Sequence, residues 1–130
     1  MAGIDSYTKL LLHMNGVDAS TVFTDSSLST KTVTTLGDAQ IDTGITDAFG
    51  GTAGCGKFDG NGDYLIVPDS TDWKFGTGNF TVDFWVYSSD WTQAYKGIIN
   101  YGEPAPTISG RSWMIATQAS GKIYVDINTG

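Results

Sequence analysis

The chain has little of what most enzymes use for proton transfer and metal chemistry. Glutamate, histidine and cysteine occur once each, at Glu103, His13 and Cys55. A lone cysteine excludes a disulfide within the chain, so the fold does not depend on an oxidising compartment. A single histidine without paired cysteines argues against a zinc site and against a histidine-based nucleophilic triad. We therefore predict that the protein is not an enzyme.

Basic residues are also scarce. Seven Lys and Arg stand against 14 Asp and Glu, which leaves a formal charge of -7. Such a surface repels phosphates, so we expect no nucleic-acid partner. The apolar run Leu10–Leu12 is far shorter than a membrane span or the apolar segment of an export signal. We expect no membrane insertion and no cleaved export signal.

Strand-forming and turn-forming residues are abundant. Ser and Thr together number 28 and Gly numbers 17, while good helix formers are few. Alternating apolar and polar residues predict a long strand over 80–87 and another over 123–127. Shorter strands are expected at 9–14, 31–35, 55–58, 64–67, 97–101 and 112–117. This pattern predicts an all-β fold.

Turn residues separate these strands. Asp59-Gly-Asn-Gly-Asp63 predicts a hairpin, because Asn-Gly readily adopts positive φ. We expect loops at 15–29 and 104–110 and one short helix at 70–74. The length of 130 residues suits one domain, 1–130. Many short strands at this spacing indicate a β-sandwich or a jelly roll.

Three motifs occur in a familiar order. They are LLLHMNG at 10–16, FTDSS at 23–27 and FDGNGDYLIVPDSTDWKFGTGNFTVDFWVY at 58–87. Together they resemble the laminin-G-like, concanavalin A-like jelly-roll family, in the form common in bacteriophage tail and other virion proteins. The resemblance spans nearly the whole chain. It implies a two-sheet antiparallel jelly-roll sandwich with a concave face, typically non-catalytic and adhesive.

The chain departs from the resembled family in one respect. Members of that family usually continue for several further strands, which include a Trp-His-His-type segment and a Val-Asp-Gly turn. We therefore expect one of two things. Either residues 1–130 are the N-terminal part of a longer domain, so that the sandwich is truncated at residue 130, or another chain completes the sandwich. An incomplete sandwich would leave unpaired strand edges, which favour association.

The turn at 59–63 has two interpretations. Asp59, Asn61 and Asp63 have the oxygen spacing that begins a calcium loop. The pattern then fails, because Tyr64 replaces the required Gly and Ser70 stands where a bidentate Glu is expected. The simpler interpretation is a turn whose side chains bond nearby amides. The cofactor prediction is therefore none, or calcium at Asp59, Asn61 and Asp63.

A carbohydrate site is a second hypothesis. Aromatic faces stack on sugars, and Asp or Asn side chains bond to hydroxyls. Such residues alternate on two predicted strands and would meet if both strands share a sheet. They are Asp83, Trp85, Tyr87, Tyr124, Asp126 and Asn128. The alternative is that a second sheet or a neighbouring subunit covers these aromatic side chains.

These features lead to three functional hypotheses. The first is a non-catalytic structural or attachment protein of a virion, assembled in the host cytoplasm with other virion proteins or copies of itself. The second is a carbohydrate-binding module that acts outside the cell on surface polysaccharide. The third is a glycoside hydrolase, which needs two carboxyl groups about 5–9.5 Å apart. The sequence disfavours the third, because Glu103 is isolated and Asp83 has Trp85 rather than an acid two residues later.

Overall fold

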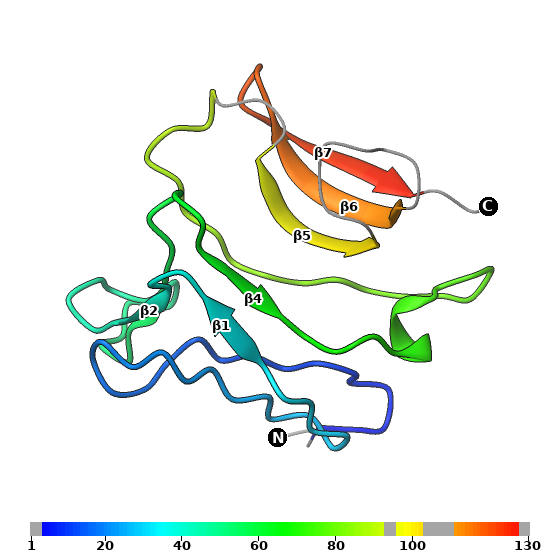
Figure 1. Ribbon diagram of the computed structural model, residues 1–130, viewed down its shortest axis with the longest axis horizontal. Coiled ribbons are helices and arrows are strands. Elements are labelled where there is room, and N and C mark those ends of the chain that lie inside the picture. The colour runs from blue at the N-terminus through cyan, green and yellow to red at the C-terminus, as the bar shows by residue number, and fades with distance from the viewer. Residues whose placement is uncertain (1–3, 93–95, 103–110, 128–130) are drawn as a thin grey trace. The chain divides into compact units, whose positions relative to one another are not determined.

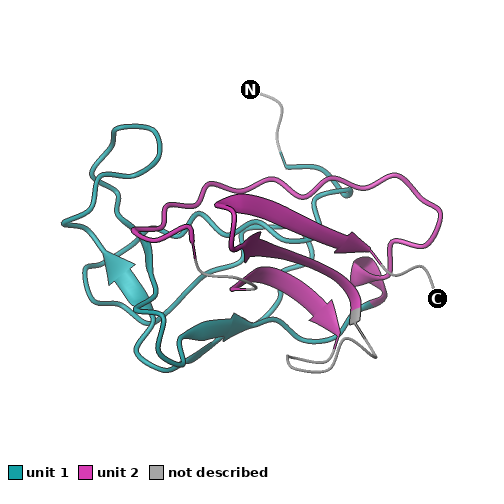
Figure 2. Ribbon diagram, turned by 90° about the horizontal axis from the view of Figure 1, so that it is seen from above, with its two compact units in different colours: residues 1–70 teal, residues 71–130 magenta. Residues whose placement is uncertain are grey.

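Short antiparallel strands make up most of the regular structure. The computed structural model describes residues 4–92, 96–102 and 111–127, and in these residues it forms seven strands and one 3-10 turn. The prediction of a nearly all-β chain is therefore confirmed. The chain divides into unit 1, residues 1–70, and unit 2, residues 71–130 (Figure 2). No helix among the described residues is long and apolar enough to cross a membrane.

In unit 1, two nested strand pairs form an interrupted ribbon. Strand β1 (Thr34–Leu36) pairs with β4 (Tyr64–Ile66) (Figure 1). Strand β2 (Gln40–Asp42) pairs with β3 (Cys55–Lys57). Because β2 and β3 lie between β1 and β4 in the sequence, the two pairs are nested, but they form two separate two-stranded sheets. Residues 37–39 connect β1 to β2 and residues 58–63 connect β3 to β4, so these two segments interrupt the pairing.

The interruption depends on glycine. Gly37 has a φ of 73°, and a Cβ at this position would clash with the Asp63 carboxylate. On the other segment, Gly60 and Gly62 have φ values of 84° and 85°. The turn residues predicted at 59–63 therefore do adopt the left-handed conformation that glycine tolerates. No other residue type would allow Asp63 to lie so close to the backbone of residue 37.

The predicted hairpin at 59–63 is wrong in its pairing. The flanking strands β3 and β4 do not pair with each other; β3 pairs with β2, and β4 pairs with β1. The residues at 59–63 do form the predicted turn. A turn sequence is a local feature, however, and it does not indicate which strands pair with the segments on either side of it. Strand β2 was missed for a related reason: it has only three residues, too few for a periodic pattern.

The predicted strand at 9–14 is also wrong. Only one bridge forms there, between Leu12 and Asp25, and residues 15–29 otherwise form the expected loop. The amides that a neighbouring strand would bond are bonded here by the Asp25 carboxylate. It accepts hydrogen bonds from the amides of Leu11, Ser27 and Lys31 at 3.0, 2.9 and 2.8 Å. The Ser27 hydroxyl donates a fourth bond at 2.9 Å. The side chain of one aspartate thus holds three stretches of backbone together.

Unit 2 contains a three-stranded antiparallel sheet. Its order is β5 (Gly97–Gly102), β6 (Arg111–Gln118) and β7 (Lys122–Ile127) (Figure 1). The strands predicted at 97–101, 112–117 and 123–127 are confirmed. Five successive residues of the central strand, 113–117, are buried. Four of them are the buried apolar residues of the described part of this unit: Trp113, Met114, Ile115 and Ala116.

The longest predicted strand, 80–87, is wrong. This segment runs as an extended trace without ladder pairing among the described residues (Figure 1). Phe80 and Val82 line a cleft, whereas residues 83–87 are exposed on both sides of the segment. The short helix expected at 70–74 is confirmed as η1 (Thr71–Trp73). The expected loop at 104–110 lies outside the described residues.

Candidate functional site

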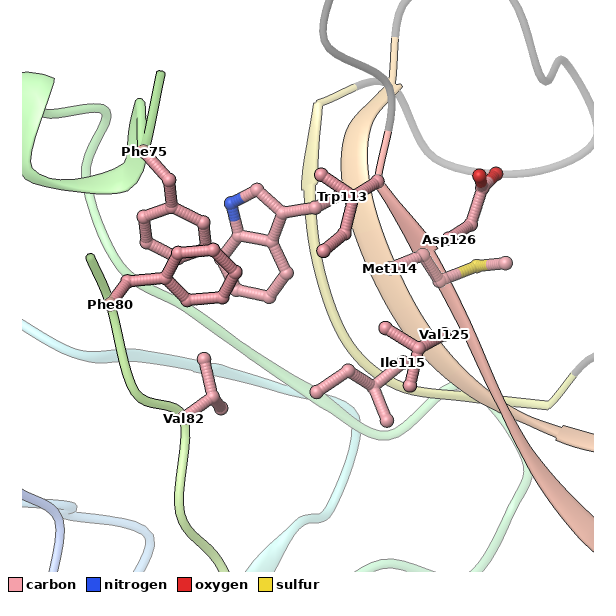
Figure 3. A pocket seen from close by; sticks show the side chains of 9 residues that line it. Phe75, Phe80, Val82, Trp113, Met114, Ile115, Val125 and Asp126 are labelled. Carbon is pink, nitrogen blue, oxygen red and sulfur yellow. The ribbon is translucent and has the colours of Figure 1, made fainter. Parts of the chain in front are cut away.

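An apolar cleft of about 200 Å³ lies within unit 2. Figure 3 shows side chains of the 75–82 segment on one side and side chains of β6 and β7 on the other. Among the described residues, Asp126 is the one charged residue that lines the cleft. The described lining consists of Phe75, Phe80, Val82, Trp113, Met114, Ile115, Val125, Asp126 and Ile127. Such a surface suits an apolar side chain or the apolar face of a ring.

Three stacked aromatic rings, two from the 75–82 segment and one from β6, form a wall that joins the two sides of this cleft. Phe75 lies in the middle, with its ring centroid 4.0 Å from that of Phe80 and 5.0 Å from that of Trp113 (Figure 3). The interplanar angles are 12° and 21°, so the rings are nearly parallel. The indole Nε1 of Trp113 donates a hydrogen bond to the Trp73 carbonyl at 2.9 Å. This bond fixes the orientation of the indole and hence of the wall.

Sequence reasoning missed this wall. The alternation over 80–87 placed Phe80 and Val82 on an apolar face, and both do line the cleft. Phe75 belongs to no periodic pattern, and alternation does not show which face of its strand Trp113 occupies. The indole and the carbonyl that it bonds are 40 residues apart in the sequence. A single sequence carries no local signal for a contact over that separation.

The structure does not bring the predicted carbohydrate residues together. The hypothesis required 80–87 and 123–127 to share a sheet, but the sheet that contains β7 consists of β5, β6 and β7 among the described residues. Asp126 lines the cleft and Tyr124 is half-buried on β7, whereas Asp83, Trp85 and Tyr87 are exposed. Asn128 lies outside the described residues, as does Glu103. Carbohydrate binding at these positions stays a prediction.

The turn at 59–63 forms an acidic cluster with a residue that the sequence pattern did not include. Asp38, Asp59 and Asp63 each have a carboxylate oxygen within 4.8 Å of the others. Asp63 accepts hydrogen bonds from the amides of Asp38 at 2.7 Å and of Asp59 at 2.8 Å. Asp59 in turn accepts a bond from the amide of Asn61 at 2.6 Å. These bonds organise the turn and join it to the segment that contains Asp38.

The same contacts shift the pKa values of Asp38 and Asp63 in opposite directions. A side-chain hydrogen bond to Asp63 and the negative charge of Asp63 raise the pKa of Asp38. The hydrogen bond from the backbone amide of Asp59, together with the one from the amide of Asp38, holds the pKa of Asp63 below its ordinary value, although burial acts to raise it. As pH falls, Asp38 therefore takes up a proton before Asp63 does.

The hydrogen bonds account for the conformation of the turn, so calcium binding at Asp59, Asn61 and Asp63 stays a prediction. Thermal unfolding with added calcium tests it, because an ion that binds only the folded chain raises the melting temperature. Asp38→Asn is the informative variant, since it removes a carboxylate of the cluster while the Asp38 amide still bonds Asp63. An equal response of both proteins to calcium would show that Asp38 is not a ligand, and an unchanged melting temperature of the unsubstituted protein would contradict calcium binding at Asp59, Asn61 and Asp63.

No known protein family, no curated protein and no solved structure matches this chain. The resemblance to laminin-G-like domains therefore has no support beyond the motifs that carry it. The described fold agrees with that resemblance at the level of an all-β chain with antiparallel sheets.

Proposed function

We propose that this chain is a non-catalytic structural or attachment protein of a virus particle, built on a laminin-G-like two-sheet jelly roll. The order of the three sequence motifs suggests this assignment, and the antiparallel all-β structure is compatible with it. The observation that carries the proposal is the amount of exposed apolar surface in unit 2. It includes Phe80, Phe84, Val86, Ile123, Val125 and Ile127.

The exposed apolar side chains of unit 2 support the proposal because they form a group rather than occurring singly. Single exposed apolar residues are ordinary on a protein surface, but larger groups mark contacts with other molecules. Here the exposed residues come from the 80–86 segment and from β7, and both also line the apolar cleft. A protein that is assembled into a particle would cover such a surface with its neighbours. The net charge of -7 would keep the free chain soluble before assembly.

Association with particles tests this function. Virus particles produced by the source cells would be banded on a density gradient, and the chain would be detected by mass spectrometry. We expect the chain to band with the particles and to remain there after a wash in high salt, because apolar contacts are not screened by ions. A chain found only in the soluble fractions would contradict the proposal. Turnover of a glucan in a reducing-sugar assay would contradict its non-catalytic part.

Carbohydrate binding is the second candidate, and one observation favours it. The side chains of Trp85 and Tyr87 are 71% and 87% exposed, two positions apart on the same extended segment, with Asp83 exposed beside them. Exposed indole and phenol rings can stack on the apolar face of a sugar, and a carboxylate can accept bonds from its hydroxyls. An attachment protein could use such a segment to hold a surface polysaccharide.

We expect Trp85→Ala to weaken any glycan binding about tenfold, since stacking on one aromatic ring contributes on the order of 1–2 kcal/mol. A glycan array would identify the ligand, and titration calorimetry would measure the affinity. Tyr7→Ala is the matched control, because Tyr7 is 85% exposed and belongs to unit 1. Binding that survives Trp85→Ala unchanged, or is lost equally in the control, would count against this candidate.

A further inference from the structure

Strand β7 is the regular edge of the unit 2 sheet. In the order β5-β6-β7 it is outermost, and no other strand of the described chain pairs with it. The opposite edge, β5, is interrupted by register shifts between Gly97 and Ile99 and between Tyr101 and Gly102. Such irregularities discourage pairing with another chain. β7 has none of them, because its register with β6 is continuous over all six residues.

The backbone groups that face the open edge can be identified. The Thr117 amide donates to the Lys96 carbonyl at 2.9 Å, which is the β5 side of β6. Successive residues of a strand direct their N–H and C=O groups to opposite sides, so Ala116 and Gln118 face β7. Their partners there are Tyr124 and Lys122. The intervening residues of β7 therefore direct their backbone groups outward: Ile123, Val125 and Ile127.

The side chains of β7 are symmetric about Tyr124. Ile123 and Val125 lie one residue to either side, and Lys122 and Asp126 lie two residues to either side. When two copies of β7 run antiparallel with their Tyr124 residues opposed, Ile123 faces Val125 and Lys122 faces Asp126. Neither Lys122 nor Asp126 has an ion-pair partner within the described part of its own chain. The strand therefore carries the charge that complements its own copy.

We propose that two copies of this chain pair edge to edge through β7, antiparallel about Tyr124, and join their two sheets into one of six strands. Ile123 and Val125 exchange backbone hydrogen bonds across the pair, since both direct these groups outward. Lys122 and Asp126 fall at the alternate positions, where opposing side chains lie closest together. A two-fold axis repeats each contact, so each dimer contains two Lys122–Asp126 pairs.

The charges select both the partner and the register. Two chains of charge -7 repel each other, so an attractive contact between them needs opposite charges placed face to face. Moving the centre of symmetry from Tyr124 to Val125 would oppose Asp126 to Tyr124 and break both ion pairs. Pairing also covers part of Ile123 and Val125, which are 48% and 56% exposed. A second copy of this chain therefore fits the edge in one register.

This inference rests on the proposed function of assembly, to which it adds a partner and a surface. An edge contact of five residues is smaller than a standard interface, so we expect association that depends on concentration. A dimer that is weakened by charge reversal on β7, from a chain that is absent from particles, would contradict the proposed function in a virus particle but support the pairing through β7. A chain that bands with particles but remains a monomer when purified would overturn the pairing alone.

Charge reversal on β7 tests the pairing. Sedimentation velocity of the purified full chain, from micromolar to millimolar concentration, should show a monomer–dimer equilibrium that weakens as salt is added. Lys122→Asp and Asp126→Lys should each raise the dissociation constant about tenfold, because each substitution places like charges opposite one another twice per dimer. The double variant, Lys122→Asp with Asp126→Lys, should recover the affinity of the unsubstituted chain.

Two further variants separate pairing from folding. Lys74→Asp makes the same charge change at an exposed lysine of unit 2 outside β7, and it should leave the dissociation constant unchanged. Val125→Pro removes an outward amide that β6 does not use, so it should abolish the dimer while the thermal transition persists. A monomer at every concentration, single reversals without effect, or a double variant that does not recover would each overturn the proposal.

Discussion

Asp25→Asn is expected to lower the free energy of unfolding by about 3 kcal/mol. The Asp25 side chain is 3% exposed, and its two oxygens accept four hydrogen bonds. Asparagine keeps one acceptor oxygen but turns its NH₂ group toward two of the four donors, which leaves those two donors without an acceptor. Urea unfolding followed by far-UV circular dichroism measures the loss, because the four tryptophans all lie in unit 2 and Asp25 lies in unit 1.

Asp5→Asn is the control for this substitution. Asp5 also accepts bonds from nearby amides, those of Tyr7 and Thr8, but it is exposed, so water can replace them. We expect a much smaller change in the urea midpoint. If Asp25→Asn unfolded at the same urea concentration as the unsubstituted protein, the buried carboxylate would not hold the three backbone stretches of unit 1 together.

The same carboxylate makes stability depend on pH. Burial of Asp25 opposes its ionisation, but the amides of Ser27, Leu11 and Lys31 together with the Ser27 hydroxyl outweigh this, so its folded-state pKa lies below the ordinary value. A lowered folded pKa stabilises the protein above the unfolded pKa of about 4, and this contribution disappears as pH falls through the folded pKa. In Asp25→Asn, this part of the acid sensitivity should be absent.

Trp113→Ala is expected to cost about 3–5 kcal/mol, in the range found for large aromatic side chains removed from a buried position. The substitution removes a 92%-covered indole (8% exposed) from the aromatic stack and leaves a cavity beside Phe75. Equilibrium unfolding in guanidinium measures the loss, and near-UV circular dichroism reports whether the remaining rings keep their packing. A loss below about 1 kcal/mol would show that the wall is not part of the stable structure of unit 2.

Trp113→Phe separates packing from hydrogen bonding at this position. Phenylalanine can still stack on Phe75, but it cannot donate to the Trp73 carbonyl. We expect a cost of about 1–2 kcal/mol, from a lost hydrogen bond and a smaller ring. Equal losses for the two variants would mean that the orientation of the indole, rather than its volume, holds the stack.

Local patterns predicted the elements that local physics controls. Alternation identified β7, because its side chains meet different surroundings on the two faces of the sheet, and glycine identified the turn at 59–63. Alternation failed at 80–87, where apolar and polar residues alternate but no strand of the described residues pairs with the segment. The same limit applies to the site. The sequence spacing predicted that Asp59 and Asp63 lie close together. Asp38 lies beside them only because β1 pairs with β4, which the sequence pattern did not indicate.

By itself the sequence determined the chemistry of this protein: an acidic, β-forming chain with one histidine, one glutamate and no disulfide. It also determined that β7 carries opposite charges two residues to either side of Tyr124. Only the tertiary structure decided that β7 is the outermost strand of its sheet among the described residues, that the Asp25 carboxylate bonds three backbone stretches, and that Phe75 and Trp113 stack. The physical reason is sequence separation. Composition and alternation describe neighbours along the chain, whereas an edge, a buried carboxylate and a ring stack depend on which distant segments meet.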